Sequence, residues 1–473
     1  MRHIFILYLY LSLLPCAAWA DFDKERIKTL GLEVVDITTV DGELPTCDYV
    51  EGPDGTMGIT SINRTKVGCR IVITMLNDTL YDSGEYEKGV SGAIININGN
   101  TSGQYYNKPY KIKLQKKADL LTRGDSCYDD KEWRLLKDAY RMTTLAGLKV
   151  NELMGMPWTP RYKPCNVFLN GDYQGCYLLI ESTKRNSDCR LNVNKKTGYI
   201  IERDPYWWSE EHYFTTNYFA SRKSYRWTWK YPDEEDVTQE QEDYIRDYIN
   251  QVEKSIDEGS YEKYIDVVSF AKWLLAHDIL GTWDSGGSNL YVMKYDNTEK
   301  SLLQMCNLWD FDTAFKMEQT AFSRYHTGSI DFYFPKLLDN TNKAFLNAYK
   351  QLWNEKKDSI YNHIVTFLNS YPDSEEGKAL QLSINEHDKR WECTHETLIK
   401  NANDILAWFG EHWTFLEKEI NHDTKIDHII VLQQQNNQPL FNIAGQKVNA
   451  QCQLKPGIYI SKGKKIILSS FSL

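Results

Sequence analysis

The hydrophobic pattern of this 473-residue chain changes partway along its length, and the change limits which folds the chain can adopt. Between about residues 32 and 180, short apolar runs are separated by Gly, Asn and Asp, which is typical of β-strands joined by turns. From about residue 239 to 422, apolar residues recur at helical spacing over longer segments. The pattern therefore predicts an α+β protein with a β-rich front and a helical back, joined by an aromatic, loop-rich stretch that ends near residue 231.

The clearest local signal in the front half lies between residues 166 and 180. Two apolar runs flank Asn170-Gly171, and an Asn-Gly pair in this position is the strongest short-range signal for a β-hairpin. Cys165 and Cys176 flank the turn and could form a disulfide or remain buried free thiols. Before the hairpin, residues 138–154 are expected to form a helix.

The N-terminus has the pattern of an export signal. Arg2 precedes an apolar run over residues 4–14, and Ala18-Trp19-Ala20 places small residues before a cleavage site. The run is about half of the roughly 20 residues that a membrane-spanning helix needs. We therefore expect a signal peptide over residues 1–20, export to the periplasm, cell surface or medium, and no transmembrane segment in the mature chain.

Composition excludes two broad classes of protein. Aromatic residues make up 13% of the chain, far above the aromatic-poor composition of disordered proteins. The formal net charge of −10 disfavours a surface that follows nucleic-acid phosphates, so we expect no nucleic-acid partner. The cysteines form no C-x-x-C pair or Cys/His cluster with zinc-ligand spacing, so the sequence does not predict a structural metal.

Residues 283–312 hold the side chains that point to chemistry. Asp284 and Asn289 stand five apart in a Gly-containing loop between a predicted helix and a predicted strand, the spacing of the catalytic Asp and metal-binding Asn of protein kinases. A second predicted strand leads to Trp309-Asp310-Phe311-Asp312, and carboxylates are ligands that Mg²⁺ prefers. Asp312 is either a second metal ligand or a helix cap.

The order of elements before this segment matches a kinase small lobe. A Gly-containing loop at residues 99–103 precedes a strand that carries Lys111 and Lys113, and a helix and the hairpin ending at Glu181 follow. Three familiar kinase motifs are absent: His-Arg before Asp284, Asp-Phe-Gly and G-x-G-x-x-G. A Walker A motif is absent too, which argues against a P-loop NTPase.

Residues 99–102, 108–114, 170–181 and 309–312 resemble the CotH kinase family, and the resemblance extends over about residues 30–420. It implies a two-lobed, atypical protein-kinase-like domain that uses ATP and Mg²⁺ or Mn²⁺ to phosphorylate secreted or surface proteins. The roles that it implies are catalytic for Asp284, metal-binding for Asn289 and Asp310, and phosphate-contacting for Lys111 or Lys113.

Two further residues enter through the resemblance. Arg141 matches a family arginine of unassigned role near the start of the predicted helix. Glu181 stands where the lobes should join; it would border the adenine or organise a lysine, or it is an exposed carboxylate at a strand end.

The C-terminal residues change character again. Short strand-like runs and turns from residue 426 resemble the sorting or Ig-like modules that end many exported proteins of type IX-secreting bacteria. The predicted organisation is therefore a signal peptide at 1–20, a β-rich segment at 21–98, a CotH-like kinase domain at 99–424 and a β module at 425–473.

An alternative function is a surface-assembly protein that keeps a kinase scaffold without turnover. The aromatic segment from Tyr206-Trp207-Trp208 to Trp227-Thr228-Trp229 motivates it, because aromatic platforms suit glycans or protein partners. The same residues would equally serve as packing in the core or in a lid.

Overall fold

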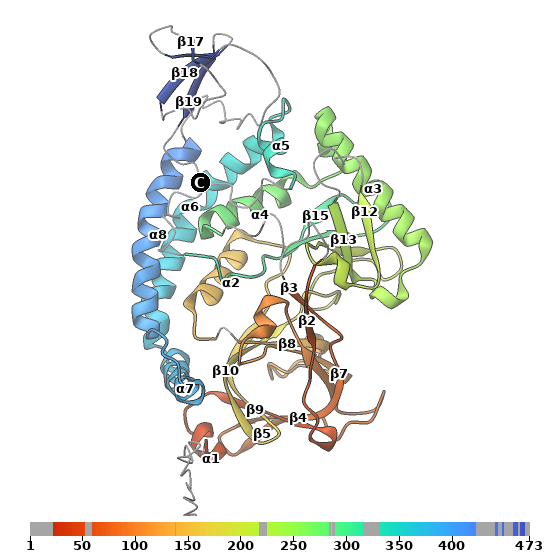
Figure 1. Ribbon diagram of the computed structural model, residues 1–473, viewed down its shortest axis with the longest axis vertical. Coiled ribbons are helices and arrows are strands. Elements are labelled where there is room, and N and C mark those ends of the chain that lie inside the picture. The colour runs from red at the N-terminus through yellow and green to blue at the C-terminus, as the bar shows by residue number, and fades with distance from the viewer. Residues whose placement is uncertain are drawn as a thin grey trace, which may run out of the picture. The chain divides into compact units, whose positions relative to one another are not determined.

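The computed structural model describes residues 22–52, 59–137, 139–216, 225–282, 285, 289–315 and 332–421, and four short strands between residues 440 and 468. The chain divides into one compact unit that ends at Ile420 and a second that begins at Asn421. Figure 1 shows the elements of both units, and no described helix combines the length and apolar character that crossing a membrane requires. The predicted signal peptide lies outside the described residues.

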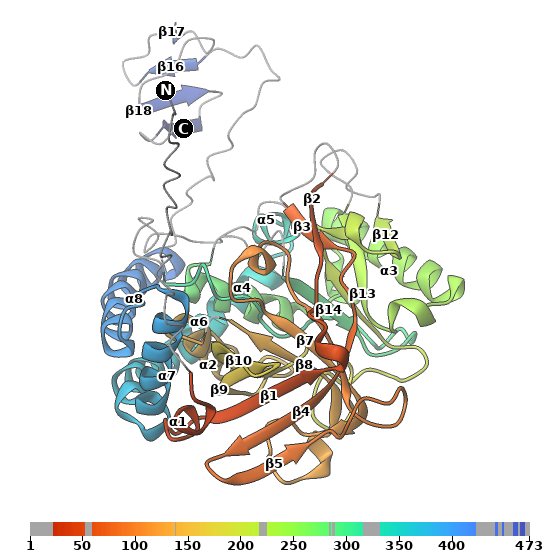
Figure 2. The same cartoon turned by 60° about the horizontal axis from the view of Figure 1, so that its bottom comes forward.

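A closed β-barrel forms the front of the first unit. Seven strands form the barrel: β1 (Glu33–Thr39), β4 (Val67–Met75), β6 (Ala93–Ile97), β7 (Tyr110–Ala118), β8 (Asp130–Leu136), β9 (Tyr162–Leu169) and β10 (Asp172–Glu181). An eighth strand, β5 (Asp78–Asp82), pairs with β4 at the edge. The eight strands pair in the order β1-β9-β10-β8-β7-β6-β4-β5. Because β1 also pairs with β4, the sheet closes on itself, and Figure 2 shows β1 between β9 and β4.

The barrel interior follows from alternation along each strand. Tyr110, Ile112 and Leu114 of β7 are buried in the barrel core, whereas Lys111 and Lys113 point to the other face. Each fully buried aliphatic side chain of this kind stabilises the fold by about 1.5–3 kcal/mol. The predicted alternation of this strand is confirmed.

The predicted hairpin is also confirmed. β9 and β10 pair antiparallel around Asn170 and Gly171, which have φ values of 52° and 82°. Positive φ at both central residues is the geometry of a two-residue type I′ turn, which Asn and Gly tolerate best. Cys165 lies in the barrel core and Cys176 in the core shared with the helices, so the two free thiols occupy opposite faces of the sheet.

Helix α2 (Met142–Met154) packs against the helices behind the barrel. It begins four residues after the predicted start, because Arg141 has extended backbone angles and forms its N-cap. Gly155 ends it in the left-handed conformation, as glycine commonly does after a helix.

The remaining helices form the back of the unit, and Figure 1 shows α4 and α6 above the barrel strands. They are α3 (Gln239–Glu258), α4 (Val267–Leu280), α5 (Phe334–Leu338), α6 (Ala344–Ser370), α7 (Glu375–Trp391) and α8 (Leu398–Asn421). A short α1 (Lys24–Lys28) precedes the barrel. The expected mixture of a β-rich front and a helical back is confirmed.

A second sheet occupies the stretch that was expected to be loop-rich, and that expectation is wrong. Its strands are β11 (Tyr199–Arg203), β12 (Tyr213–Thr216), β13 (Tyr225–Tyr231), β14 (Leu290–Lys294) and β15 (Leu303–Met305). The order is β12-β13-β11-β14-β15. Strand β11 therefore pairs with β14, which is distant from it in the sequence. Local sequence cannot report such a pairing, since it depends on residues beyond any short window.

Two small sheets complete the part of the chain that the structure describes. β2 (Asp48–Glu51) and β3 (Ile59–Ile62) pair in the first unit. In the second unit, β16 (Leu440–Asn442), β17 (Lys447–Val448), β18 (Gly457–Ser461) and β19 (Lys464–Leu468) pair in the order β17-β16-β18-β19.

Candidate functional site

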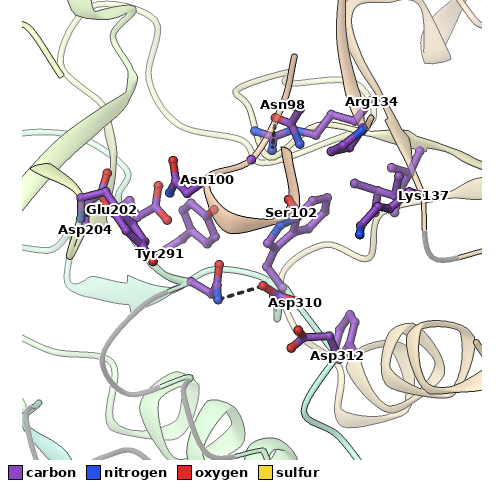
Figure 3. A pocket seen from close by; sticks show the side chains of 18 of the residues that line it. Asn98, Asn100, Ser102, Arg134, Lys137, Glu202, Asp204, Tyr291, Asp310 and Asp312 are labelled. Carbon is purple, nitrogen blue, oxygen red and sulfur yellow. Dashed lines mark hydrogen bonds between the residues drawn. The ribbon is translucent and has the colours of Figure 1, made fainter. Parts of the chain in front are cut away.

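A cavity of about 390 Å³ lies in the first unit, where the barrel, α2 and the second sheet meet. The loop between β6 and β7 contributes Asn100 and Ser102, and the end of β8 contributes Arg134 and Lys137. The other walls come from α2, from the strands β11 and β14, and from the segment after β15 (Figure 3).

Asn289 and Asp310 meet in this cavity because of sheet topology. Asn289 immediately precedes β14 and Asp310 follows β15, and these antiparallel neighbours bring the start of one strand to the end of the other. The Asn289 amide Nδ2 donates to Asp310 Oδ2 at 3.3 Å. Both residues have positive φ, 55° and 63°, which Asn and Asp adopt more readily than other non-glycine residues. The predicted pair is thus brought together.

Asp312 lies in the same cavity, and its Oδ1 atom is buried with no hydrogen-bond partner among the described residues. The helix-cap alternative is not realised in the described residues, which continue as a turn to Phe315. A buried carboxylate oxygen without a partner is costly, so it points to a ligand that the cavity would receive.

The segment that carries both aspartates is anchored on α2. The ring of Phe311 lies against Gly147, where a Cβ atom would overlap the ring. Asn151 of the same helix accepts a hydrogen bond from the Leu308 backbone N–H at 2.7 Å. These contacts hold the carboxylates of Asp310 and Asp312 at fixed positions.

Two cations face these carboxylates from the end of β8. Arg134 donates to Asn98 Oδ1 at 3.1 Å and lies over the ring of Trp309. Lys137 is only 8% exposed, and its Nζ lies 3.5 Å from the centroid of the Tyr105 ring. Figure 3 shows Arg134 and Lys137 above Asp310 and Asp312 in the view.

The other end of the cavity is acidic. Glu202 pairs with Lys230 at 2.7 Å, and the Asp204 carboxylate accepts a hydrogen bond from Thr228 Oγ1 at 3.1 Å. Burial, followed by repulsion from Glu202, raises the pKa of Asp204 to about 7. Burial alone would lower the pKa of Lys230, but the carboxylates around it raise that pKa overall.

The predicted lysines lie beside the cavity instead of in its lining. Lys111 and Lys113 on β7 pair with Glu132 at 3.1 and 3.7 Å. Strand β7 pairs with β8, and Arg134 on β8 lies directly opposite Lys111. Arg134, unlike Lys111, lines the cavity. Two of the cations that line the cavity, Arg134 and Lys137, therefore come one strand later than the sequence pattern indicated.

The remaining predicted residues have different placements. Glu181 is fully buried, bonded to Arg123 at 2.9 Å and to the Arg161 backbone N–H at 2.9 Å, and lies outside the cavity lining. Its alternative as an exposed carboxylate is therefore wrong. Arg141 lies beside the Tyr140 ring, also outside the lining. Asp284 lies outside the described residues.

Sequence reasoning missed Arg134, Lys137, Glu202 and Asp204 as cavity residues. A signal existed for the first two, because an Arg and a Lys three residues apart flank the apolar pair Leu135-Leu136 at the end of a strand-like run. Glu202 and Asp204 carried no such signal, since their segment was not recognised as part of a sheet.

A sequence model described as CotH kinase protein matches residues 95–393, which is more than half of the chain. The match begins within β6 and ends after α7, so it includes most of the cavity residues and excludes the C-terminal β16–β19 sheet. No curated protein matches the chain.

Proposed function

The chain belongs to the CotH kinase protein family, and from this premise we propose that the cavity binds Mg-ATP and transfers the γ-phosphate to a hydroxyl of a secreted or surface protein. One observation carries the proposal: Asn289, Asp310 and Asp312 share a cavity with Arg134 and Lys137. Oxygen ligands for a metal and cations for phosphate are the two parts that phosphoryl transfer requires.

The donor set fits Mg²⁺ or Mn²⁺. The metal would be held by the carboxylates of Asp310 and Asp312 and the amide oxygen of Asn289, and the partnerless Oδ1 of Asp312 is consistent with this role. When bound, the ion would offset the negative charge of the phosphates.

The charges in the cavity orient the nucleotide. Arg134 and Lys137 would contact phosphate oxygens, because charge-assisted bonds to phosphate are the strongest that side chains offer. Glu202 and Asp204 would repel phosphate, but their carboxylates can accept hydrogen bonds from ribose hydroxyls. We therefore place the phosphates at the Arg134 end and the sugar toward Glu202.

The order of elements supports a kinase-like, two-lobed arrangement. Helix α4, the loop that contains Asp284 and Asn289, the β14–β15 pair and Asp310 follow one another as the catalytic and metal-binding segments of kinases do. In this arrangement Asp284 would orient the attacking hydroxyl and accept its proton, while Asn289 and Asp310 serve the metal. Export through residues 1–20 would bring the enzyme to its substrates.

The alternative of a non-catalytic glycan- or protein-binding platform receives less support. Trp227 and Trp229 are 0% and 6% exposed and belong to the hydrophobic core. These two side chains cannot form an exposed stacking surface, so a platform would depend on the half-buried Tyr206, Trp207 and Trp208.

Nucleotide binding is tested by the shift in melting temperature on adding ATP with Mg²⁺ or Mn²⁺, because a ligand of the native state must stabilise it. Transfer is tested by incorporation of label from γ-labelled ATP into the chain itself or a Ser/Thr-rich acceptor. The proposal predicts both signals in the wild type and neither in Asp310→Asn. A full shift and full labelling in Asp310→Asn would overturn it.

A further inference from the structure

A second cluster of metal-binding side chains lies at the end of α7, outside the cavity lining. It consists of His387 on α7 and of Cys393 and His395 in the connection to α8. One ligand atom from each of the three lies within 4.8 Å of the others. Imidazole nitrogen and thiolate sulfur are the donors that Zn²⁺ prefers.

Local backbone geometry builds the cluster. Glu392 has a φ of 49° and ends α7 in the left-handed conformation, which turns the chain back on the helix. Asp388 stabilises this turn, because its carbonyl accepts from the Cys393 N–H at 3.1 Å and its Oδ2 from the His395 N–H at 2.8 Å.

An independent observation at His387 points to a ligand. The side chain is fully buried, and neither Nδ1 nor Nε2 has a hydrogen-bond partner among the described residues. A buried imidazole normally satisfies at least its N–H, since an unmet polar group in the interior destabilises the fold. His387 sits against Gly175 of β10, where a Cβ atom would overlap its ring. Because residue 175 is a glycine, the His387 ring fits beside β10, although neither of its nitrogens makes a hydrogen bond there among the described residues.

Asp388 lies against two of the three donors. Its Oδ1 lies 2.5 Å from His395 Nδ1 and 3.5 Å from Cys393 Sγ, and Sγ lies 3.8 Å from the same Nδ1. Donors around one tetrahedral zinc ion are separated by about 3.3–3.8 Å, given bonds of about 2.0–2.3 Å. Both separations that involve Sγ fall in this range, and an ion would take the place of the hydrogen bond between Asp388 and His395.

We propose that His387, Cys393 and His395 form a binding site for Zn²⁺, with the Asp388 carboxylate beside two of these ligands. One thiolate and one carboxylate balance the charge of the ion, so the complex is neutral in a partly buried place. The sequence did not predict a structural metal because the pattern H-D-x₄-C-x-H lacks the usual zinc spacing; the turn at Glu392 is what gathers the donors.

The site lies beside the segment that joins β8 to α2. The ring of Tyr140, from that segment, contacts the His395 ring in a tilted arrangement at 3.7 Å between centroids, and its centroid lies 5.6 Å from that of His387. Bound zinc would therefore fix the α7–α8 connection against residues that follow Lys137 in the chain. The role we assign to the ion is structural, and it is independent of whether the cavity transfers phosphate.

The experiment uses the full chain, reduced and freed of metal, to which zinc chloride or cobalt chloride is added. We expect one zinc per chain by elemental analysis and, with cobalt, the charge-transfer absorption of a thiolate ligand. Both signals should be lost in Cys393→Ser and in His395→Gln and kept in Cys127→Ser, a matched control at another partly exposed free cysteine. Asp310→Asn should also keep them, which separates this site from the cavity.

A second measurement does not depend on the folding of any variant. In the wild-type chain, alkylation of each cysteine is followed by mass spectrometry with and without zinc. Zinc should abolish labelling of Cys393 and leave labelling of Cys127 unchanged, because a metal-bound thiolate is protected. Unchanged labelling of Cys393, or variants that bind zinc and cobalt as the wild type does, would overturn the proposal.

Discussion

The cavity and the end of α7 both gather potential metal ligands, but they do so with opposite chemistry. Asn289, Asp310 and Asp312 present oxygen atoms beside Arg134 and Lys137, a setting that suits Mg²⁺ carrying phosphates. The cluster of His387, Cys393 and His395 presents nitrogen and sulfur, a setting that suits Zn²⁺ without a charged substrate. If each site binds the ion that we propose for it, the difference in donor type alone would separate the two metals.

The two sites also differ in how the fold assembles them. The cavity ligands stand at the ends of neighbouring strands, so sheet pairing places them. The α7 cluster is local in sequence, but it depends on the turn at Glu392 and on the space beside Gly175. Substitutions can therefore affect one site and spare the other.

The largest expected effect is that of Asp310→Asn on catalysis. Loss of one carboxylate ligand should reduce phosphotransfer by about 100-fold or more, since even weaker changes around metal ligands cost 10–100-fold. The rate is measured with γ-labelled ATP at saturating Mg²⁺. Asp78→Asn, at an exposed position on β5, is the matched control and should transfer phosphate as the wild type does. If Asp310→Asn and Asp78→Asn transferred phosphate at the same rate, Asp310 would not be a metal ligand.

The next effect concerns pH. The folded protein holds a proton on Asp204 up to a pKa of about 7, whereas the unfolded chain releases it near 3.8. The contribution of Asp204 to the unfolding free energy is therefore fully present below pH 3.8 and is lost as the pH rises through about 7. The total loss is at most about 4 kcal/mol. Asp204→Asn should flatten the decline in unfolding free energy between pH 5 and 8, measured by denaturant titration. An unchanged pH profile would contradict the assignment.

Arg134→Gln tests which strand supplies the phosphate contact. A charge-assisted bond contributes about 1.5–3 kcal/mol, so the Kd for Mg-ATP should rise by roughly 10- to 150-fold. Lys113→Ala, on the neighbouring strand β7, should change the Kd little, because Lys113 pairs with Glu132 outside the cavity lining. Calorimetric titration measures both. A larger rise in Kd for Lys113→Ala than for Arg134→Gln would instead assign the phosphate contact to β7.

A smaller effect is expected from a pair of glycine substitutions. Gly147→Ala would press a methyl group into Phe311 and displace the segment with Asp310, at a cost of about 1–3 kcal/mol in unfolding free energy. Gly410→Ala in α8 meets no atom within 4 Å and should stabilise the helix by about 0.5–1 kcal/mol. Zinc binding should survive in both variants. If Gly147→Ala were as stable and as active as Gly410→Ala, the anchoring role of α2 would be wrong.

Several features could be predicted because they depend on neighbours in the chain. The turn at Asn170-Gly171 needs positive φ at two adjacent residues, and the alternation along β7 needs only the period of a strand. The meeting of Asn289 with Asp310 was also within reach, because two consecutive strands joined by a short connection usually pair.

Other features were decided by partners far away in sequence. The barrel closes because β1 pairs with both β4 and β9, and β11 finds its place through β14. The tertiary structure places Arg134 in the cavity lining, whereas Lys111 pairs with Glu132 beside it. No short window of sequence contains that information.

By itself, the sequence determined the β-rich front, the helical back and the hairpin, because local periodicity and turn chemistry encode them. It also singled out Asn289, Asp310 and Asp312 as candidate ligands. The tertiary structure alone decided that the barrel closes, which cations line the cavity, and that His387 lies with Cys393 and His395 in a space kept open by Gly175. The physical reason is that packing and strand pairing act between residues that are distant along the chain, where side-chain spacing carries no signal.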